Sequence, residues 1–141
     1  MDVFLVDDDP MNIRRLAEIL KPDGHTVRAA TSGMRALEAM RAQPPDLVLL
    51  DIELPDRSGL EVCRALLQEP ATRGVRVVFI SAHDGSAEKA AAYAAGGSDY
   101  LRKPFDAEEV RARAASQLAV ARLQRENAAL RAELDALRRS R

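Results

Sequence analysis

The sequence LVLLDIELPDRSG at residues 47–59 decides the fold of this chain. Its first four residues are a continuous apolar run, and the carboxylate of Asp51 ends that run. Continuous Val, Leu and Ile runs are typical of strands buried on both faces, as in a parallel sheet covered by helices. The Pro, Ser and Gly that follow mark a turn, and Ser58 with Glu61 is spaced like a helix capping box. We therefore expect a buried strand, a loop and a helix start within this stretch.

Similar apolar runs recur on both sides of this stretch, each bounded by polar or turn residues. Between the runs, apolar residues repeat at the three- and four-residue spacing of amphipathic helices. This alternation predicts an α/β fold, a (βα)5 chain around a parallel sheet. The predicted strands are residues 3–6, 25–29, 47–50, 75–80 and, weakly, 100–101.

Length and composition fit one globular domain. The chain has 141 residues, of which 47% are hydrophobic and 30% charged, and its net charge of -1 implies no strong attraction to nucleic acid or to a membrane surface. One cysteine, Cys63, excludes an internal disulfide, and its place on an apolar helix stripe indicates a core residue. No apolar run approaches the roughly 20 residues that span a bilayer, and MDVFLVDDDP lacks the basic start of a secretory signal. We expect a cytoplasmic protein.

The small net charge is the sum of two unlike parts. Residues 1–116 contain 15 basic and 19 acidic side chains, and residues 117–141 contain 6 and 3, so -4 and +3 add to -1. From Ala107 onward the chain consists almost entirely of Ala, Leu, Arg, Glu and Gln, which are strong helix formers. We expect a globular domain over residues 1–116 and a helical extension over residues 117–141.

Polar side chains with useful chemistry stand where the predicted strands end. Asp7 and Asp8 end the first, Asp51 the third and Ser81 the fourth, and Lys103 follows the fifth. Since the carboxyl ends of parallel strands share one edge of the sheet, these five residues should meet in one pocket. Three clustered carboxylates repel one another unless a cation intervenes, and Mg2+ prefers oxygen ligands of this kind. The lysine and serine could hold the remaining oxygens of a phosphoryl group.

Four motifs stand in order along the chain: FLVDDDP at 4–10, LVLLDIELPDRSG at 47–59, VVFISAH at 77–83 and GGSDYLRKPF at 96–105. Each motif is weak alone, but the combination is specific and covers most of residues 1–116. Together they resemble the receiver domain of two-component response regulators. The resemblance implies a doubly wound, flavodoxin-like sheet with strand order 2-1-3-4-5. It also implies a signalling module, phosphorylated by a histidine kinase or a phosphotransfer protein, that catalyses only its own phosphorylation and dephosphorylation.

The roles of the metal and phosphate residues follow from this resemblance. Asp51 resembles the phosphoacceptor, a carboxylate nucleophile. Asp8 resembles a direct Mg2+ ligand and Asp7 one that acts mainly through metal-bound water, and the backbone carbonyl of Glu53 would complete the protein ligands. Lys103, in a Lys-Pro bond that is commonly cis in the family, would pair with a phosphoryl oxygen.

The resemblance also implies a switch. Ser81 would hydrogen-bond the phosphoryl group and draw its loop inward, and Tyr100 would move from outside to inside as the loop shifts. An aromatic residue on a short edge strand can also be a simple packing residue, and Asp9 is interpreted as a helix cap. Glu53 and His83 occupy the positions whose family counterparts tune the lifetime of the acyl phosphate.

A helix of 32 residues is predicted from Asp106 to Leu137, roughly 48 Å long. Beyond Leu118 its apolar residues follow a heptad period, with Val, Asn and Leu at the a positions and Leu at every d position. This resembles a parallel two-stranded zipper, in which facing Asn side chains fix the register. Glutamates 126 and 133 at g would face arginines 131 and 138 at e of a second copy. These seam residues are Val120, Leu123, Asn127, Leu130, Leu134 and Leu137.

We therefore expect a homodimer formed through the coiled coil, with help from the receiver face of the fourth helix, fifth strand and fifth helix. Two alternatives for the tail are a helix folded back on its own domain and a disordered segment. A haloacid-dehalogenase-like phosphatase is disfavoured, because its nucleophile is followed two residues later by a second Asp, where this chain has Glu53. A zipper DNA-binding protein is disfavoured because RARAASQLAVARLQRE at 111–126 is too sparsely basic, so we expect no direct nucleic-acid contact.

The output of such a module is not encoded in these residues. The helix could pass the switch to an output domain absent from this chain. Alternatively, the chain could act as a stand-alone dimerising phosphorelay or scaffold receiver.

Overall fold

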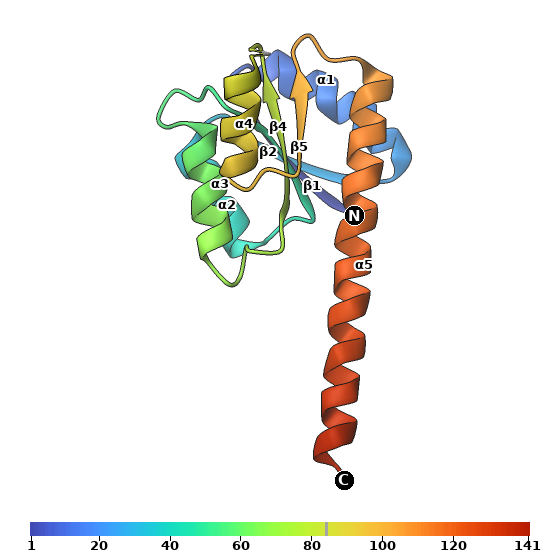
Figure 1. Cartoon of the computed structure of the whole chain (residues 1–141). Helices are drawn as coiled ribbons and strands as arrows, with labels where there is room; N and C mark the ends of the chain where they lie inside the picture. The colour runs from blue at the N-terminus through green and yellow to red at the C-terminus, as the bar shows by residue number, and fades with distance from the viewer. Residues whose placement is uncertain (84) are drawn as a thin grey trace.

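A computed structural model describes residues 1–83 and 85–141 of the chain. Strands and helices alternate along these residues, as the sequence predicts, with one short 3-10 turn, η1, after the first helix (Figure 1). In chain order they are β1 (Asp2–Val6), α1 (Pro10–Leu20), η1 (Lys21–Asp23), β2 (Thr26–Ala30), α2 (Gly33–Ala42), β3 (Leu47–Asp51), α3 (Gly59–Gln68), β4 (Arg76–Ser81), α4 (Ser86–Ala94), β5 (Asp99–Arg102) and α5 (Ala107–Arg139).

The strands form one parallel sheet in the order β2-β1-β3-β4-β5, which confirms the predicted class and topology. The register aligns the strand ends. Val6 pairs with Leu50, Asp51 with Ile80, and Ser81 with Arg102. The carboxyl ends of β1, β3 and β4 therefore lie along one edge, which is where a doubly wound sheet binds its ligands.

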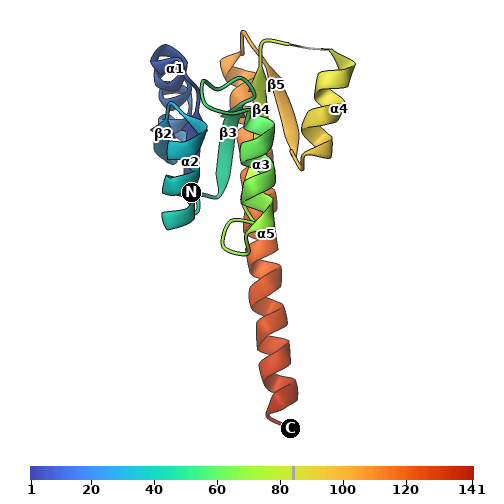
Figure 2. The same cartoon turned by 90° about the vertical axis from the view of Figure 1, so that its left-hand side faces the viewer.

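Helices cover both faces of the sheet. Figures 1 and 2 show α1 and α5 on one face and α2, α3 and α4 on the other. Successive strand residues serve opposite layers: Phe4 and Val48 belong to the core under α2 and α3, whereas Leu5 and Leu49 belong to the core under α1 and α5. This two-sided burial explains why the central strands read as continuous apolar runs.

The observed strand ends differ from the predicted ones by about one residue. β3 and β4 each extend by one residue to include Asp51 and Ser81, and β2 begins at Thr26 rather than His25. β5 covers four residues rather than the two predicted at 100–101, because the polar residues Asp99 and Arg102 also pair with β4. At the edge of a sheet, backbone pairing continues through residues whose side chains are not fully buried, and hydropathy does not detect them.

Helix starts occur at the predicted capping residues. The side chain of Asp9 accepts a hydrogen bond from the backbone N–H of Met11 at 2.9 Å, as expected for a cap ahead of Pro10. Ser58 and Asp106 cap α3 and α5. Each accepts from the N–H two residues further on rather than from the third residue of a capping box.

α5 is one continuous helix of 33 residues that ends two residues beyond its predicted end. Its first half packs on the sheet as far as Ala121, whereas its second half projects away from the body (Figures 1 and 2). There is no break between residues 116 and 117, and Gln117 and Leu118 are still buried. The seam leucines beyond Ala121 are 52–63% exposed, so the tail does not fold back on its own domain. None of the helices within residues 1–83 and 85–141 is both long and apolar enough to cross a bilayer.

Candidate functional site

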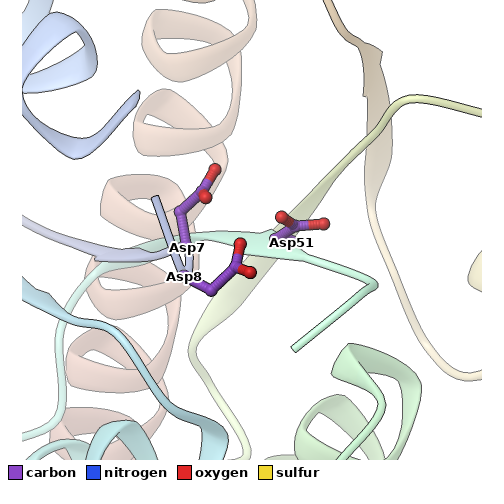
Figure 3. A group of neighbouring side chains, drawn as sticks. All are labelled: Asp7, Asp8 and Asp51. Atoms are coloured by element: carbon purple, nitrogen blue, oxygen red, sulfur yellow. The ribbon is translucent and has the colours of Figure 1, made fainter. Parts of the chain in front are cut away.

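Three aspartates meet at the carboxyl edge of the sheet. Asp7 and Asp8 follow β1, and Asp51 is the last residue of the neighbouring strand β3. Figure 3 shows the three side chains gathered at this edge. One oxygen of each lies within 4.8 Å of the others. Asp7 and Asp51 are only 2% and 5% exposed, whereas Asp8 is exposed. The site is therefore a buried acidic floor with one acid open to solvent.

Lys103 reaches this floor from the loop between β5 and α5. Its Nζ lies 2.8 Å from Oδ2 of Asp51 and 3.0 Å from Oδ2 of Asp7. Its backbone N–H donates to the carbonyl of Ser81 at 2.8 Å, and the Lys103-Pro104 bond is cis. Next to it, the buried Phe105 lies under the guanidinium of Arg15, 4.8 Å from the ring centre. The lysine therefore occupies a defined position in which it joins the two buried acids.

Burial and pairing shift the pKa values of the joined groups. Burial raises the pKa of Asp51, and this rise is opposed in part by the hydrogen bonds from Lys103 and from the N–H of Glu53. Burial alone would lower the pKa of Lys103, but the hydrogen bonds to Asp51 and Asp7 outweigh it and raise that pKa. At neutral pH the ammonium is thus fully charged and partly neutralises the acidic floor.

The loop after Asp51 wraps closely around the carboxylate. The N–H of Glu53 donates to Oδ1 of Asp51 at 3.0 Å, and Glu53 forms an isolated bridge with Ser58. Gly59 sits so close that a Cβ there would lie 2.2 Å from the carbonyl oxygen of Asp51. This requirement for glycine could not be predicted from the sequence, although Gly59 belongs to the motif LVLLDIELPDRSG, because no unusual φ or turn type signals a close approach.

The proposed switch residues are connected through one backbone segment. The buried Ser81 Oγ accepts a hydrogen bond from the N–H of His83 at 3.1 Å. The hydroxyl of Tyr100, whose residue is 6% exposed, donates to the carbonyl of His83. Tyr100 thus lies on the inside, and His83 joins it to Ser81.

The side chain of His83 contacts Glu53, two residues after Asp51. Its Nε2 pairs with Oε1 of Glu53, and its Nδ1 lies 3.7 Å from Oε1 of Glu88. In the sequence, Glu53 and His83 belong to two separate motifs. Their pairing could not be predicted because 30 residues separate them.

The donor set fits Mg2+. Three carboxylates offer hard oxygen atoms, and the exposed Asp8 leaves room for water and phosphate oxygens. In the described part of the chain, no other group of three Asp, Glu, His or Cys residues is arranged for a metal. The roles of the individual ligands, including the carbonyl of Glu53, stay predictions.

Known proteins share both the sequence and the fold. The model of the response regulator receiver domain matches residues 3–115. The response regulator PleD of Caulobacter vibrioides is 38% identical over 104 residues, and the DNA-binding response regulator MtrA of Mycolicibacterium smegmatis is 36% identical over 116 residues. Among solved structures, NtrX of Brucella abortus, in complex with ATP, superposes with a TM-score of 0.83 at 31% identity.

These similarities cover most of the chain but only part of each relative. The matches include 74% of this chain with PleD, 82% with MtrA and 92% with NtrX. They correspond to 23%, 50% and 29% of those proteins' chains. The chain therefore spans half or less of the length of the relatives compared.

Proposed function

This chain belongs to the receiver domains of two-component response regulators, and on that premise we propose that Asp51 accepts a phosphoryl group from a histidine kinase or phosphotransfer protein. One observation carries the proposal: a buried carboxylate at the end of β3, paired with Lys103 and flanked by Asp7 and Asp8. In the transfer, an oxygen of Asp51 forms the new O–P bond and the N–P bond of the phosphohistidine breaks. The imidazole nitrogen keeps that electron pair and takes up a proton, and Asp51 becomes an acyl phosphate.

Asp7, Asp8, Asp51 and the carbonyl of Glu53 would hold Mg2+, as in the predicted ligand set. The bound ion would supply positive charge against the negative charge that gathers on the carboxylates and the phosphoryl oxygens. Lys103, whose Nζ contacts both Asp51 and Asp7, would supply a second positive charge. Positioning and charge neutralisation account for the chemistry, so the module acts only on its own phosphorylation and dephosphorylation.

Ser81 and Tyr100 would form the switch. Since Ser81 Oγ accepts the N–H of His83, its own hydroxyl proton remains available for a phosphoryl oxygen. A hydroxyl drawn toward that oxygen would pull on His83, and through the His83 carbonyl on the hydroxyl of Tyr100. This chain of hydrogen bonds supports a switch that links the phosphate to the surface of β5.

The tail would bring two copies together in parallel. At about 100° per residue, the seam positions lie on the side of α5 opposite to the buried Ala114, Leu118 and Ala121. Extended backward, the same heptads reach Arg113 at an a position and Glu109 at a d position. Arg113 bonds both oxygens of Asp99 in β5, at 3.1 and 3.0 Å. The seam is thus continuous with the face of α4, β5 and α5, which supports one dimer surface that includes both.

We propose that the dimeric helix transmits the switch to an output domain absent from this chain. The greater length of PleD and MtrA supports this over a stand-alone scaffold. The proposed location is the cytoplasm. A free, buried cysteine such as Cys63 fits this reducing compartment. Nucleic acid and membrane are not among the proposed partners of these residues.

The test is phosphate incorporation from acetyl phosphate with Mg2+. Wild type should take up one phosphoryl group per chain, and Asp51→Asn should take up none. Asp56→Asn is the matched control, since Asp56 is an exposed acid of the same loop. Removal of Mg2+ with EDTA should slow the wild type to the rate of the Asp51 variant. A wild type that takes up no phosphate, or an Asp51 variant that matches it, would contradict the proposal.

A further inference from the structure

Two polar contacts hold α5 at the amino-terminal edge of the sheet, on the side away from the aspartates. Arg76 Nε donates to Oε1 of Gln117 at 3.0 Å. Further along the helix, the guanidinium of Arg125 pairs with Oδ1 of Asp46. Asp46 and Gln117 are 5% and 8% exposed, although both carry polar side chains. Gln117 and Arg125 lie on either side of Ala121, and the second half of α5 projects away from the body (Figure 1).

Asp46 is fixed firmly in the body. Its N–H donates to the carbonyl of Asp2 at 2.9 Å, its carbonyl accepts from the N–H of Arg76 at 3.1 Å, and its Oδ2 accepts from the N–H of Asp2 at 2.7 Å. Within the described residues its Oδ1 has no hydrogen-bond partner and faces Arg125. A buried carboxylate oxygen that accepts no hydrogen bond is costly, so Oδ1 attracts a cation strongly.

Apolar packing is sparse at this point. A cavity of about 310 Å³ lies between α5 and the starts of β3 and β4, beside Asp46 and Arg125. Its walls include small side chains of α5, Ala121 and Ala128, which leave space rather than fill it. Val110, Ala114, Leu118 and Ala121 anchor the first half of α5 on the sheet, but beyond Ala121 no side chain of the helix is buried. Where the helix leaves the body, the two polar pairs therefore add to the constraint on its direction.

Arg125 stands at a particular heptad position. With Val120 and Asn127 at a, Arg125 is at f, the position farthest from a partner helix in a coiled coil. Its side chain can therefore bind its own receiver while the a and d residues stay free. The contact with Asp46 thus determines which side of the tail is left open.

The contacts also sit at the far ends of the two strands that matter most for signalling. Asp46 directly precedes β3, which ends at Asp51, and Arg76 begins β4, which ends at Ser81. Each strand therefore connects a residue of the phosphorylation site to a residue that holds α5.

We propose that Asp46, Arg76, Gln117 and Arg125 form an underside clamp that fixes the direction and the rotational setting of the tail. The clamp keeps the seam residues on the side of α5 that faces away from the receiver, where they can pack against the tail of a second copy. Its effect on dimerisation rests on the dimer proposed above, whereas its effect on the tail direction does not.

The direct test is a distance distribution between body and tail by pulsed electron paramagnetic resonance. Spin labels at Arg64→Cys in α3 and Ala132→Cys in the tail are measured in the full chain, diluted with unlabelled chain. Cys63 stays unlabelled, since it is buried and burial raises the pKa of its thiol to about 11. Arg125→Ala should broaden the distribution about twofold. Arg139→Ala, at the same heptad position but beyond the body, should leave the width unchanged.

Equal widths for the two alanine variants and wild type would overturn the clamp. Arg125→Lys, which keeps a cation for Asp46, should restore a narrow distribution. Because the Arg125 side chain is 64% exposed, its substitution should leave the fold intact, which circular dichroism would verify.

Dimer affinity gives an independent readout by sedimentation. Since an f residue does not touch the partner helix, Arg125→Ala should weaken the dimer about 3- to 10-fold only through its own receiver. Arg139→Ala should not weaken it, and equal affinities for the two variants would count against the clamp. A wild type that stays monomeric would contradict the proposed dimer instead, and the distance distribution would still decide the clamp.

Discussion

The receiver body and the projecting half of α5 use charged residues in opposite ways. In the body, Asp7, Asp51 and Lys103 are buried and joined within 3.0 Å, so each charge depends on its neighbours. In the tail beyond Ala121 every side chain is exposed, and the charges flank an apolar stripe without contacting the body, except Arg125. The body is therefore specified by contacts between distant residues, and the tail by a repeat along one helix. Substitutions in the body should therefore change its stability, whereas substitutions in the tail should change assembly.

The largest effect should come from crowding the body beside Asp51. Gly59→Ala would place a Cβ 2.2 Å from the carbonyl oxygen of Asp51 and 2.9 Å from Cα of Ile52, both backbone atoms that cannot rotate away. We expect a loss of about 2–4 kcal/mol in the free energy of unfolding, measured by urea denaturation. Gly74→Ala is the control, since a Cβ there meets nothing within 4 Å. Similar stabilities for the two variants would show that the loop is not tightly packed.

Substitutions in the tail should change the free energy of dimerisation by a similar amount without changing the stability of the body. Leu130 and Leu137 are 60% and 63% exposed in the single chain. Their replacement by Ser should weaken the dimer by about 100-fold or more, because each dimer loses four buried leucines. Sedimentation should show monomers with unchanged unfolding of the body. The control replaces Ala129 and Ala136, outside the seam, by Ser, and a dimer that survives the leucine changes would refute the seam.

Metal binding should sharpen the contrast, because only the body holds a cluster of acids. Mg2+ at millimolar concentration should raise the melting temperature of wild type by a few degrees, since it binds the folded state alone. Asp8→Asn should remove most of this rise and leave the melting temperature without Mg2+ nearly unchanged, because Asp8 is exposed. Asp23→Asn, an acid outside the cluster, should behave as wild type. An equal rise in the Asp8 variant would exclude that residue as a ligand.

The smallest effect should be the pH dependence linked to Asp56. Hydrogen bonds from the N–H groups of Gly33 and Met34, both at 2.8 Å, lower the pKa of this exposed carboxyl below its ordinary 3.8. A lowered pKa in the folded state stabilises the fold above the ordinary value, and this stability is lost as the pH falls through the lowered pKa. Asp56→Asn should therefore destabilise the chain at pH 7, and this effect should shrink as the pH falls below 3.8 and through the lowered pKa of Asp56, as measured by urea denaturation. A stability difference that does not vary with pH would contradict the linkage.

Much of the site was visible in the sequence because strand ends in a parallel sheet share one edge. Asp7, Asp8, Asp51 and Lys103 could be assembled from their positions after apolar runs alone, and the structure brings them together as expected. The contacts around them could not be found in this way. The pairing of Glu53 with His83 and the bonds from α2 to Asp56 join separate loops, for which hydropathy gives no signal.

The sequence by itself determined the order of strands and helices, the charged residues at the carboxyl edge of the sheet and the heptad repeat of the tail. These depend on local periodicity, which each segment carries independently of the rest. Only the tertiary structure decided the close approach of Gly59 to Asp51, the inside position of Tyr100 and the side of α5 on which the seam lies. Each of these requires two segments to occupy the same space, and the packing of the whole sheet sets the distance between them.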